Sequence, residues 1–203
     1  MSTDMRQRSW QLVASLGMPQ NSSLPELHPL KIRSIEQIAN RTLALSCVVA
    51  HSFGFDSRLA NEWLVREGIV SELTEIERRV LLGDYPDRSS LHQQVDSLFA
   101  LLWVLGMASE FSCVAEVPDD LVHRLPDIKR SESSVSFKLS IQPIAETIVA
   151  SRLDEAFCLH WAARQLLLNG QESPLSEEVI RNRRYSLEWV TSECGWDEVS
   201  IDT

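Results

Sequence analysis

The stretch SSLHQQVDSLFALLWVLGM, residues Ser89 to Met107, is the longest strongly apolar run in this 203-residue chain. Five of its aliphatic side chains recur at alternating spacings of four and three residues, which places them on one face of an α-helix. These residues are Leu91, Val95, Leu98, Leu102 and Leu105. Apolar side chains fill the other faces of the second half as well, so we expect a helix that is buried on every side. The sequence therefore predicts a mainly α fold, a single globular multi-helix domain around this buried central helix.

Capping boxes, in which a Ser or Thr and a Glu or Gln three residues later satisfy each other's backbone N–H groups, mark the start of the central helix and of two other helices. They are Ser34 with Gln37, Thr74 with Glu77, and Ser90 with Gln93. The helix that follows Ser34 has a regular apolar face, and its pattern places Arg41 on the opposite, polar face. The prediction is a chain in which short connections join one helix to the next.

Two segments break the helical pattern. Apolar residues alternate with others in residues 111–117 and again in residues 135–141, a period that is typical of strands. The sequence thus allows a small two-stranded β element. Beyond it, Pro143 suits the first turn of a helix, and Ser151 with Asp154 could end that helix and start another.

The predicted domain covers residues 1–203 and has four parts. They are an N-terminal helix and Pro-rich loop (1–33), a helical core (34–107), an irregular or short-stranded segment (108–142), and C-terminal helices with an acidic tail (143–203). The tail has four acidic residues and no basic residue after position 192, but it also contains Trp196, Val199 and Ile201. A free acidic arm would not need these apolar residues, so we expect residues 194–203 to fold back onto the last helix.

Composition disfavours several classes of function. The formal net charge of −10 repels phosphate backbones and anionic membrane surfaces, which disfavours nucleic-acid and membrane binding. The N-terminus lacks the apolar core of a secretory signal, and the apolar run at residues 98–108 is shorter than a bilayer span. Four scattered cysteines without a C-x-x-C pair favour buried thiols over disulfides or zinc. We therefore expect a cytoplasmic protein with no metal and no cofactor.

Several segments resemble a known family. The runs "EAFCLHWAARQLLLNG", "RNRRYSLEWV" and "GWDEVSIDT" in the C-terminal third, with "SIEQIANRTLAL" and "LLWVLG" earlier in the chain, resemble the bacterial family of domains of unknown function numbered 4272. The similarity extends over most of the chain from about Arg6. It departs from the family pattern before the central helix, where this chain has Gln94 and Asp96 instead of an aromatic residue and a Glu. The resemblance implies a mostly helical bacterial protein and assigns no activity or site residue.

Candidate binding residues come from the charged side chains of the C-terminal helices. Arg181, Arg183 and Arg184 lie within one helical turn, where they could bind a phosphate or carboxylate. Internal ion pairing is the favoured interpretation, since the chain has a surplus of acids. Arg183 stands one turn from two apolar residues and is expected to point partly inward.

Other pairs suggest chemistry only weakly. Cys47 and His51 stand four residues apart on a helix, but two ligands do not make a metal site. His160 has neither an acidic partner nor a nucleophile nearby in the sequence, so a core histidine is the favoured interpretation. Glu36 and Glu146 could form an acid–base pair if the fold joined them, but favourable positions near helix N-termini explain both.

Two hypotheses of function follow. The favoured one is a non-catalytic, acidic protein-interaction module with a basic protein partner, because no nucleophile, metal or phosphate-loop motif is found. The alternative is an enzyme or small-ligand-binding protein. Its pocket would be lined by Glu146, Trp161, Arg183 and Arg184.

Overall fold

The computed structural model describes the chain except for residues 1, 26, 28–30, 85–90, 109 and 203. Its α-helices are α1 (Ser2–Ser15), α2 (Ile35–Ser52), α3 (Ser57–Glu67), α4 (Glu75–Leu81), α5 (Gln94–Val104), α6 (Val135–Leu139), α7 (Glu146–Leu168) and α8 (Glu177–Val190). Short 3₁₀ turns lie at η1 (Val70–Glu72), η3 (Asp119–Arg124), η4 (Ile128–Arg130) and η5 (Trp196–Glu198). The described residues contain no strand, so the mainly α prediction is confirmed.

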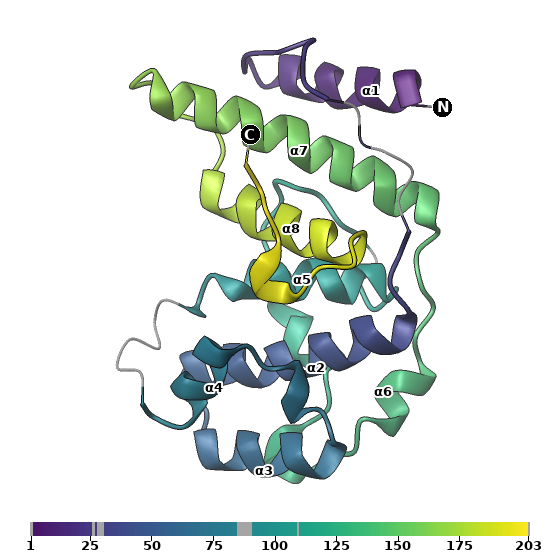
Figure 1. Cartoon of the computed structure of the whole chain (residues 1–203), viewed down its shortest axis with the longest axis vertical. Coiled ribbons are helices and arrows are strands. Elements are labelled where there is room, and N and C mark those ends of the chain that lie inside the picture. The colour runs from purple at the N-terminus through teal and green to yellow at the C-terminus, as the bar shows by residue number, and fades with distance from the viewer. Residues whose placement is uncertain (1, 26, 28–30, 85–90, 109, 203) are drawn as a thin grey trace. The chain divides into compact units, whose positions relative to one another are not determined.

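Residue contacts group the chain into two compact units. The first contains residues 1–32, 111–116 and 144–203, and the second contains residues 33–110 and 117–143. The prediction that residues 1–203 form one domain stays a prediction, and each unit is described by itself. The element order along the chain can be followed in Figure 1.

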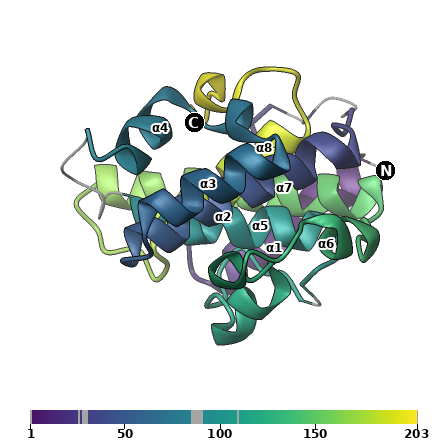
Figure 2. The same ribbon diagram turned by 90° about the horizontal axis from the view of Figure 1, so that it is seen from below.

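In the second unit, α2 packs against α3, α4 and α5; Figure 2 shows α2 and α3 side by side. Both residues of the predicted capping box at the start of α2 make their hydrogen bonds. Every residue of α5 from Asp96 to Val104 is buried, as the apolar pattern on all its faces predicts. The helix begins at Gln94, and the predicted box with Ser90 lies outside the described residues.

Arg41 is the main correction in this unit. The sequence places it on the polar face of α2, but its side chain is only 1% exposed. Its guanidinium donates two hydrogen bonds to the Glu77 carboxylate, at 2.7 and 2.6 Å, and a third to the Glu72 carbonyl. Glu77 also accepts from the Thr74 backbone N–H in the second predicted capping box. A buried arginine needs this pairing, because an unpaired charge in the interior is costly.

The prediction of two strands is wrong. Residues 111–116 have no regular structure, with Phe111 and Cys113 buried and Val114 exposed. In the second run, Phe137 is buried in the short helix α6, while Leu139 stays exposed. An alternating run needs a neighbouring strand to satisfy its backbone, and neither run has one in the described structure.

Gly106, which ends the central helix, brings that helix close to the segment after α6. It has a φ of +72°, and a Cβ built on it would lie 1.8 Å from the carbonyl oxygen of Gln142. The Gln142 N–H donates to the carbonyl of Leu105 at 3.1 Å. Any side chain at position 106 would therefore disrupt this contact as well as strain the backbone.

In the first unit, α7 lies between α1 and α8 and packs against both (Figure 1). The predicted break near Ser151 and Asp154 is absent, because α7 is continuous from Glu146 to Leu168. The side chain of Asp154 has a different role. It is buried and accepts hydrogen bonds from α1 instead of capping a new helix.

Candidate functional site

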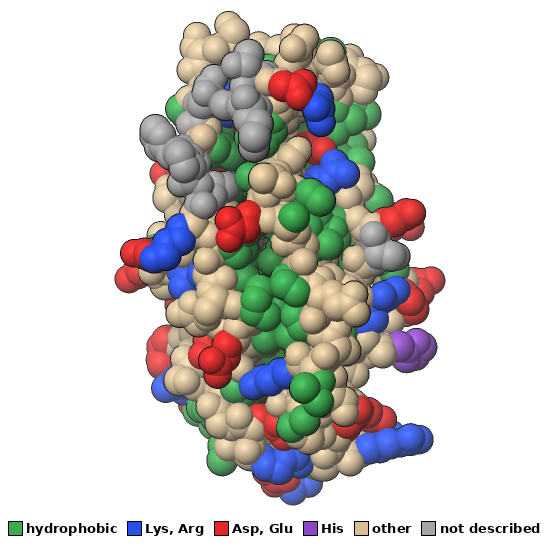
Figure 3. Space-filling view, turned by 90° about the vertical axis from the view of Figure 1, so that its right-hand side faces the viewer, with side chains coloured by type: hydrophobic (Ala, Val, Ile, Leu, Met, Phe, Trp, Pro, Cys, Tyr) green, Lys and Arg blue, Asp and Glu red, His purple; other side chains and the backbone are tan. Residues whose placement is uncertain are grey.

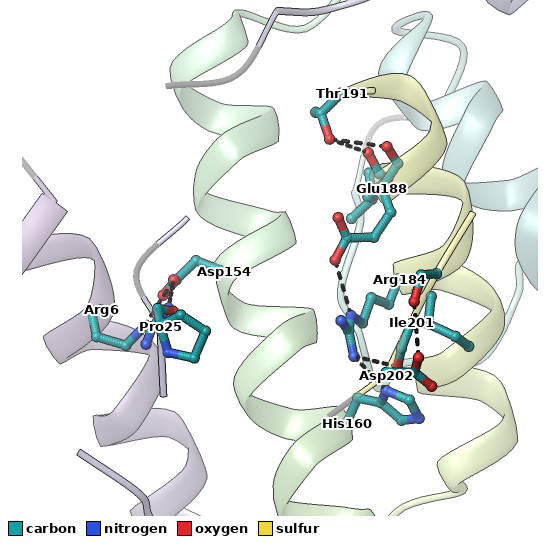
Figure 4. Close-up of polar contacts among 11 residues, drawn as sticks. Arg6, Pro25, Asp154, His160, Arg184, Glu188, Thr191, Ile201 and Asp202 are labelled. Carbon is teal, nitrogen blue, oxygen red and sulfur yellow. Dashed lines mark hydrogen bonds and ion pairs between the residues drawn. The ribbon is translucent and has the colours of Figure 1, made fainter. Parts of the chain in front are cut away.

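A group of polar side chains in the first unit, two of them buried, lies where α7 faces α8 and the C-terminal tail. Figure 4 shows its central members, His160 of α7 and Arg184 of α8, turned toward one another. Neither side chain is more than 3% exposed. We call His160, Arg184, Glu177 and Glu188 the polar cluster.

The hydrogen bonds of His160 fix its tautomer. Arg184 Nη1 lies 2.8 Å from His160 Nδ1, and a guanidinium can only donate, so Nδ1 is the unprotonated acceptor. The proton therefore sits on Nε2, which donates to Glu177 Oε1 at 2.8 Å. Burial lowers the pKa of His160, an effect that the Glu177 hydrogen bond opposes and the Arg184 charge reinforces. Both ring nitrogens are occupied, which leaves no free lone pair for a general base.

Arg184 connects the polar cluster to the tail. Its Nε donates to Glu188 Oε1 at 3.1 Å, and Nη1 also donates to the carbonyl of Ile201 at 3.1 Å. The guanidinium lies over the ring of Phe157, 4.6 Å from the ring centroid, which is a favourable cation–π distance. Burial lowers the pKa of Arg184 and raises the pKa of Glu188, and in each case the partner's charge opposes the effect of burial.

A second buried ion pair connects α1 to α7. Arg6 donates from Nε to Asp154 Oδ1 at 2.9 Å, and Ser9 Oγ donates to Asp154 Oδ2 at 2.6 Å. Arg6 also donates to the carbonyls of Leu24 and Pro25 (Figure 4). These hydrogen bonds hold the loop after α1 next to the Arg6–Asp154 ion pair. The sequence does contain a signal for this pair, since Asp154 interrupts the apolar face of α7 and a buried carboxylate needs a partner.

The thiol of Cys158 lies near both arginines but is not activated by them. Its pKa is raised to about 12, chiefly by burial and also by the charge of Asp154, while the charges of Arg6 and Arg184 oppose the rise. Burial likewise raises the pKa of Cys47 to about 12 and that of Cys113 well above its usual range. A thiol must ionise to act as a nucleophile, so these three are inert at neutral pH.

The C-terminal tail, residues 194–202, contacts α8 through Trp196 and Ile201. Trp196 is only 8% exposed, and its ring packs edge-to-face against Tyr185 at 5.2 Å and Trp189 at 5.3 Å. The Tyr185 hydroxyl donates to the carbonyl of Trp196. The tail is therefore held by an aromatic anchor near its start and by Arg184 near its end.

The structure brings only some of the predicted site residues together. Arg184 is in the polar cluster, and Trp161 follows His160 on α7, where it packs edge-to-face against Trp10 of α1. Arg183 is buried but donates to the Ser112 carbonyl at 2.6 Å, which ties residues 111–116 to α8. Glu146 is exposed in the first turn of α7, about 22 Å from Trp161 along the helix axis.

The remaining candidates have ordinary partners. His51 Nδ1 lies 2.8 Å from the carbonyl of Phe55, and Cys47 is buried, so this pair forms no metal site with a third ligand. More generally, no group of three metal-binding side chains occurs in the part of the chain that the structure describes. Glu36 and Glu146 are exposed in the first turns of their own helices. Sequence reasoning missed Glu177 as the partner of His160, because α7 and α8 join them only in three dimensions.

Comparison with protein families gives a match over most of the chain. The model of the family described as "Domain of unknown function (DUF4272)" matches residues 5–199. No curated protein and no solved structure matches the chain. Among the described residues, no helix is both long enough and apolar enough to cross a bilayer.

Proposed function

This chain belongs to the DUF4272 family, and we propose that it is a non-catalytic protein-interaction module with a basic protein partner. The observation that carries the proposal is the state of its reactive side chains. His160, which is buried and has an acidic partner, has both ring nitrogens engaged inside the fold. A catalytic site would present such a group to a substrate.

The cysteines support the same interpretation. Cys47, Cys113 and Cys158 are buried, and burial raises the pKa of each thiol, so none offers a thiolate nucleophile. No disulfide joins the four cysteines, all of which lie in the described part of the chain, and this fits a reducing compartment such as the cytoplasm.

The charge of the chain favours a basic partner. A formal net charge of −10 attracts a positively charged surface over a distance of about a Debye length. On the face drawn in Figure 3, acidic and basic side chains are interspersed with hydrophobic ones. On that face, the attraction would therefore come from the overall surplus of acids and not from one continuous acidic patch.

The test is affinity capture at low salt from cells that make the protein, followed by reconstitution with the purified candidate. We expect one reproducible partner with a basic surface, which binds the purified chain saturably and with fixed stoichiometry. Raising the ionic strength should weaken that binding, because salt screens exposed charges. Failure to capture any protein reproducibly, or binding that does not saturate on reconstitution, would contradict the proposal.

A further inference from the structure

We propose that the surface of α8 under the tail is a peptide-binding seat for a partner's linear segment. That segment would carry an aromatic side chain and, five residues later, a main-chain carbonyl that accepts from Arg184. We call Arg184, Tyr185 and Trp189 the tail seat. This inference rests on the proposed function and names the surface and the chemistry through which the module would bind.

The aromatic anchor follows from the contacts of Trp196. Its ring meets Tyr185 and Trp189 at interplanar angles of 70° and 65°, the edge-to-face arrangement that aromatic pairs favour. Tyr and Trp side chains that surround one inserted ring resemble the hot spots of protein interfaces, where a few buried aromatic residues supply most of the affinity. The seat thus selects an aromatic residue at this position.

The other contacts of the seat involve the main chain of the bound segment. Tyr185 donates to the carbonyl of Trp196, and Arg184 donates to the carbonyl of Ile201, five residues later. Any peptide offers such carbonyls, whatever its side chains. Main-chain hydrogen bonds together with one anchor pocket are typical of linear-peptide recognition.

The position of Arg184 in the tail seat does not depend on the tail alone. Arg184 is also held by His160, by Glu188 and by the ring of Phe157, none of which belongs to the tail. When the tail leaves, the guanidinium stays aimed at the position of the Ile201 carbonyl. A pre-organised site of this kind binds a ligand with a smaller entropic cost.

The tail itself is a displaceable occupant. Its regular structure is one 3₁₀ turn, in which the Glu198 N–H donates to the carbonyl of Gly195. An attached segment competes with a partner at an effective concentration on the order of millimolar for a short flexible linker. A partner segment therefore needs better contacts than the tail has, or a tail that has been weakened.

A synthetic peptide of residues 193–203, with Cys194 replaced by serine and a fluorescent label, is the probe. It is titrated against the full chain and against the full-length Trp196→Ala variant, whose own tail has lost its anchor. We expect the variant to bind the peptide at least ~10-fold more tightly than the wild type does, because the intramolecular competitor is weakened. A control peptide in which alanine also replaces the tryptophan should bind at least ~10-fold more weakly than the probe, because it lacks the anchor.

The unaltered chain gives a second measurement that does not depend on the folding of the variant. Cys194 is the most accessible cysteine, so an environment-sensitive dye attached there reports the position of the tail. Excess peptide should shift the dye emission, and the control peptide should not. Equal binding of both peptides, or no emission change with the unaltered chain, would overturn the seat.

The two proposals can fail separately. A captured basic partner that still binds the full chain when the probe peptide is in excess would overturn the seat and leave the interaction module in place. Displacement of that partner by the probe peptide supports both proposals.

Discussion

Replacing Trp196 with alanine is the sharpest test of the docked tail. The side chain is 8% exposed, and a tryptophan buries roughly 200 Å², which at about 25 cal/mol per Å² is worth about 5 kcal/mol at most. The freed tail regains conformational entropy, which offsets part of this loss. Water can fill the space that the ring leaves at the surface, so no empty cavity adds to the cost. We therefore expect a net loss of about 3 kcal/mol in the free energy of unfolding. For a chain of this size, that loss lowers the melting temperature by about 6–12 °C.

The assay is thermal unfolding followed by circular dichroism, at low and high salt. The loss should persist at high salt, because an aromatic contact is not screened. Leu168→Ala is the matched control, since that side chain is 69% exposed and should change the free energy of unfolding by less than about 0.5 kcal/mol. If the Trp196→Ala variant has the same melting temperature as the wild type, the docked tail is refuted and the tail is a free acidic arm.

Three further predictions concern buried polar groups. Glu77→Gln leaves Arg41 as an uncompensated buried charge, so it should lower the free energy of unfolding in urea by on the order of 3–5 kcal/mol. The control Glu75→Gln, at an exposed position of α4, should change it little. Equal urea midpoints for the two variants would contradict the pairing of Arg41 with Glu77. Burial lowers the pKa of His160, so the unfolded chain binds more protons below about pH 6.5 and stability falls as the pH drops through that range. His160→Gln should therefore flatten the decline of melting temperature between about pH 6.5 and 5, and an unchanged slope would assign the decline to other groups. In the native protein, a thiol reagent should modify Cys194 before the buried cysteines, which are Cys47, Cys113 and Cys158. Comparably rapid modification of those three would contradict their burial.

Local pattern predicted most of the helices. The capping boxes at Ser34 and Thr74 and the apolar run of the central helix depend on residues close together in sequence, so their outcome could be derived from spacing alone. The alternation in residues 135–141 is also a local pattern, but it led to a wrong prediction. A strand needs a partner strand, and a period of two in the sequence does not show whether one exists. The break predicted at Asp154 failed because a capping residue and a buried ion-pair partner look alike in sequence.

The polar cluster was harder to predict, because its partners lie far apart in sequence. Trp161, Arg183 and Arg184 were identified as residues of interest, but nothing in their spacing indicates which carbonyl or carboxylate each would meet. Arg183 meets a carbonyl 71 residues away, and His160 meets a carboxylate 17 residues away on another helix. The tail was predictable, since three apolar residues in an acidic segment require a surface to cover them.

The most direct test of the account is the protonation state of His160, measured by ¹⁵N NMR of the imidazole ring in the intact chain. The interpretation of a non-catalytic cluster requires the neutral ring at neutral pH, with the proton on Nε2 and a bare Nδ1 that accepts from Arg184. It also requires that the ring titrate below the pKa of a free histidine, because burial disfavours the charged form. An imidazolium at neutral pH, or a proton on Nδ1, would contradict the account, since Arg184 could then not donate to the ring and His160 would be available for chemistry.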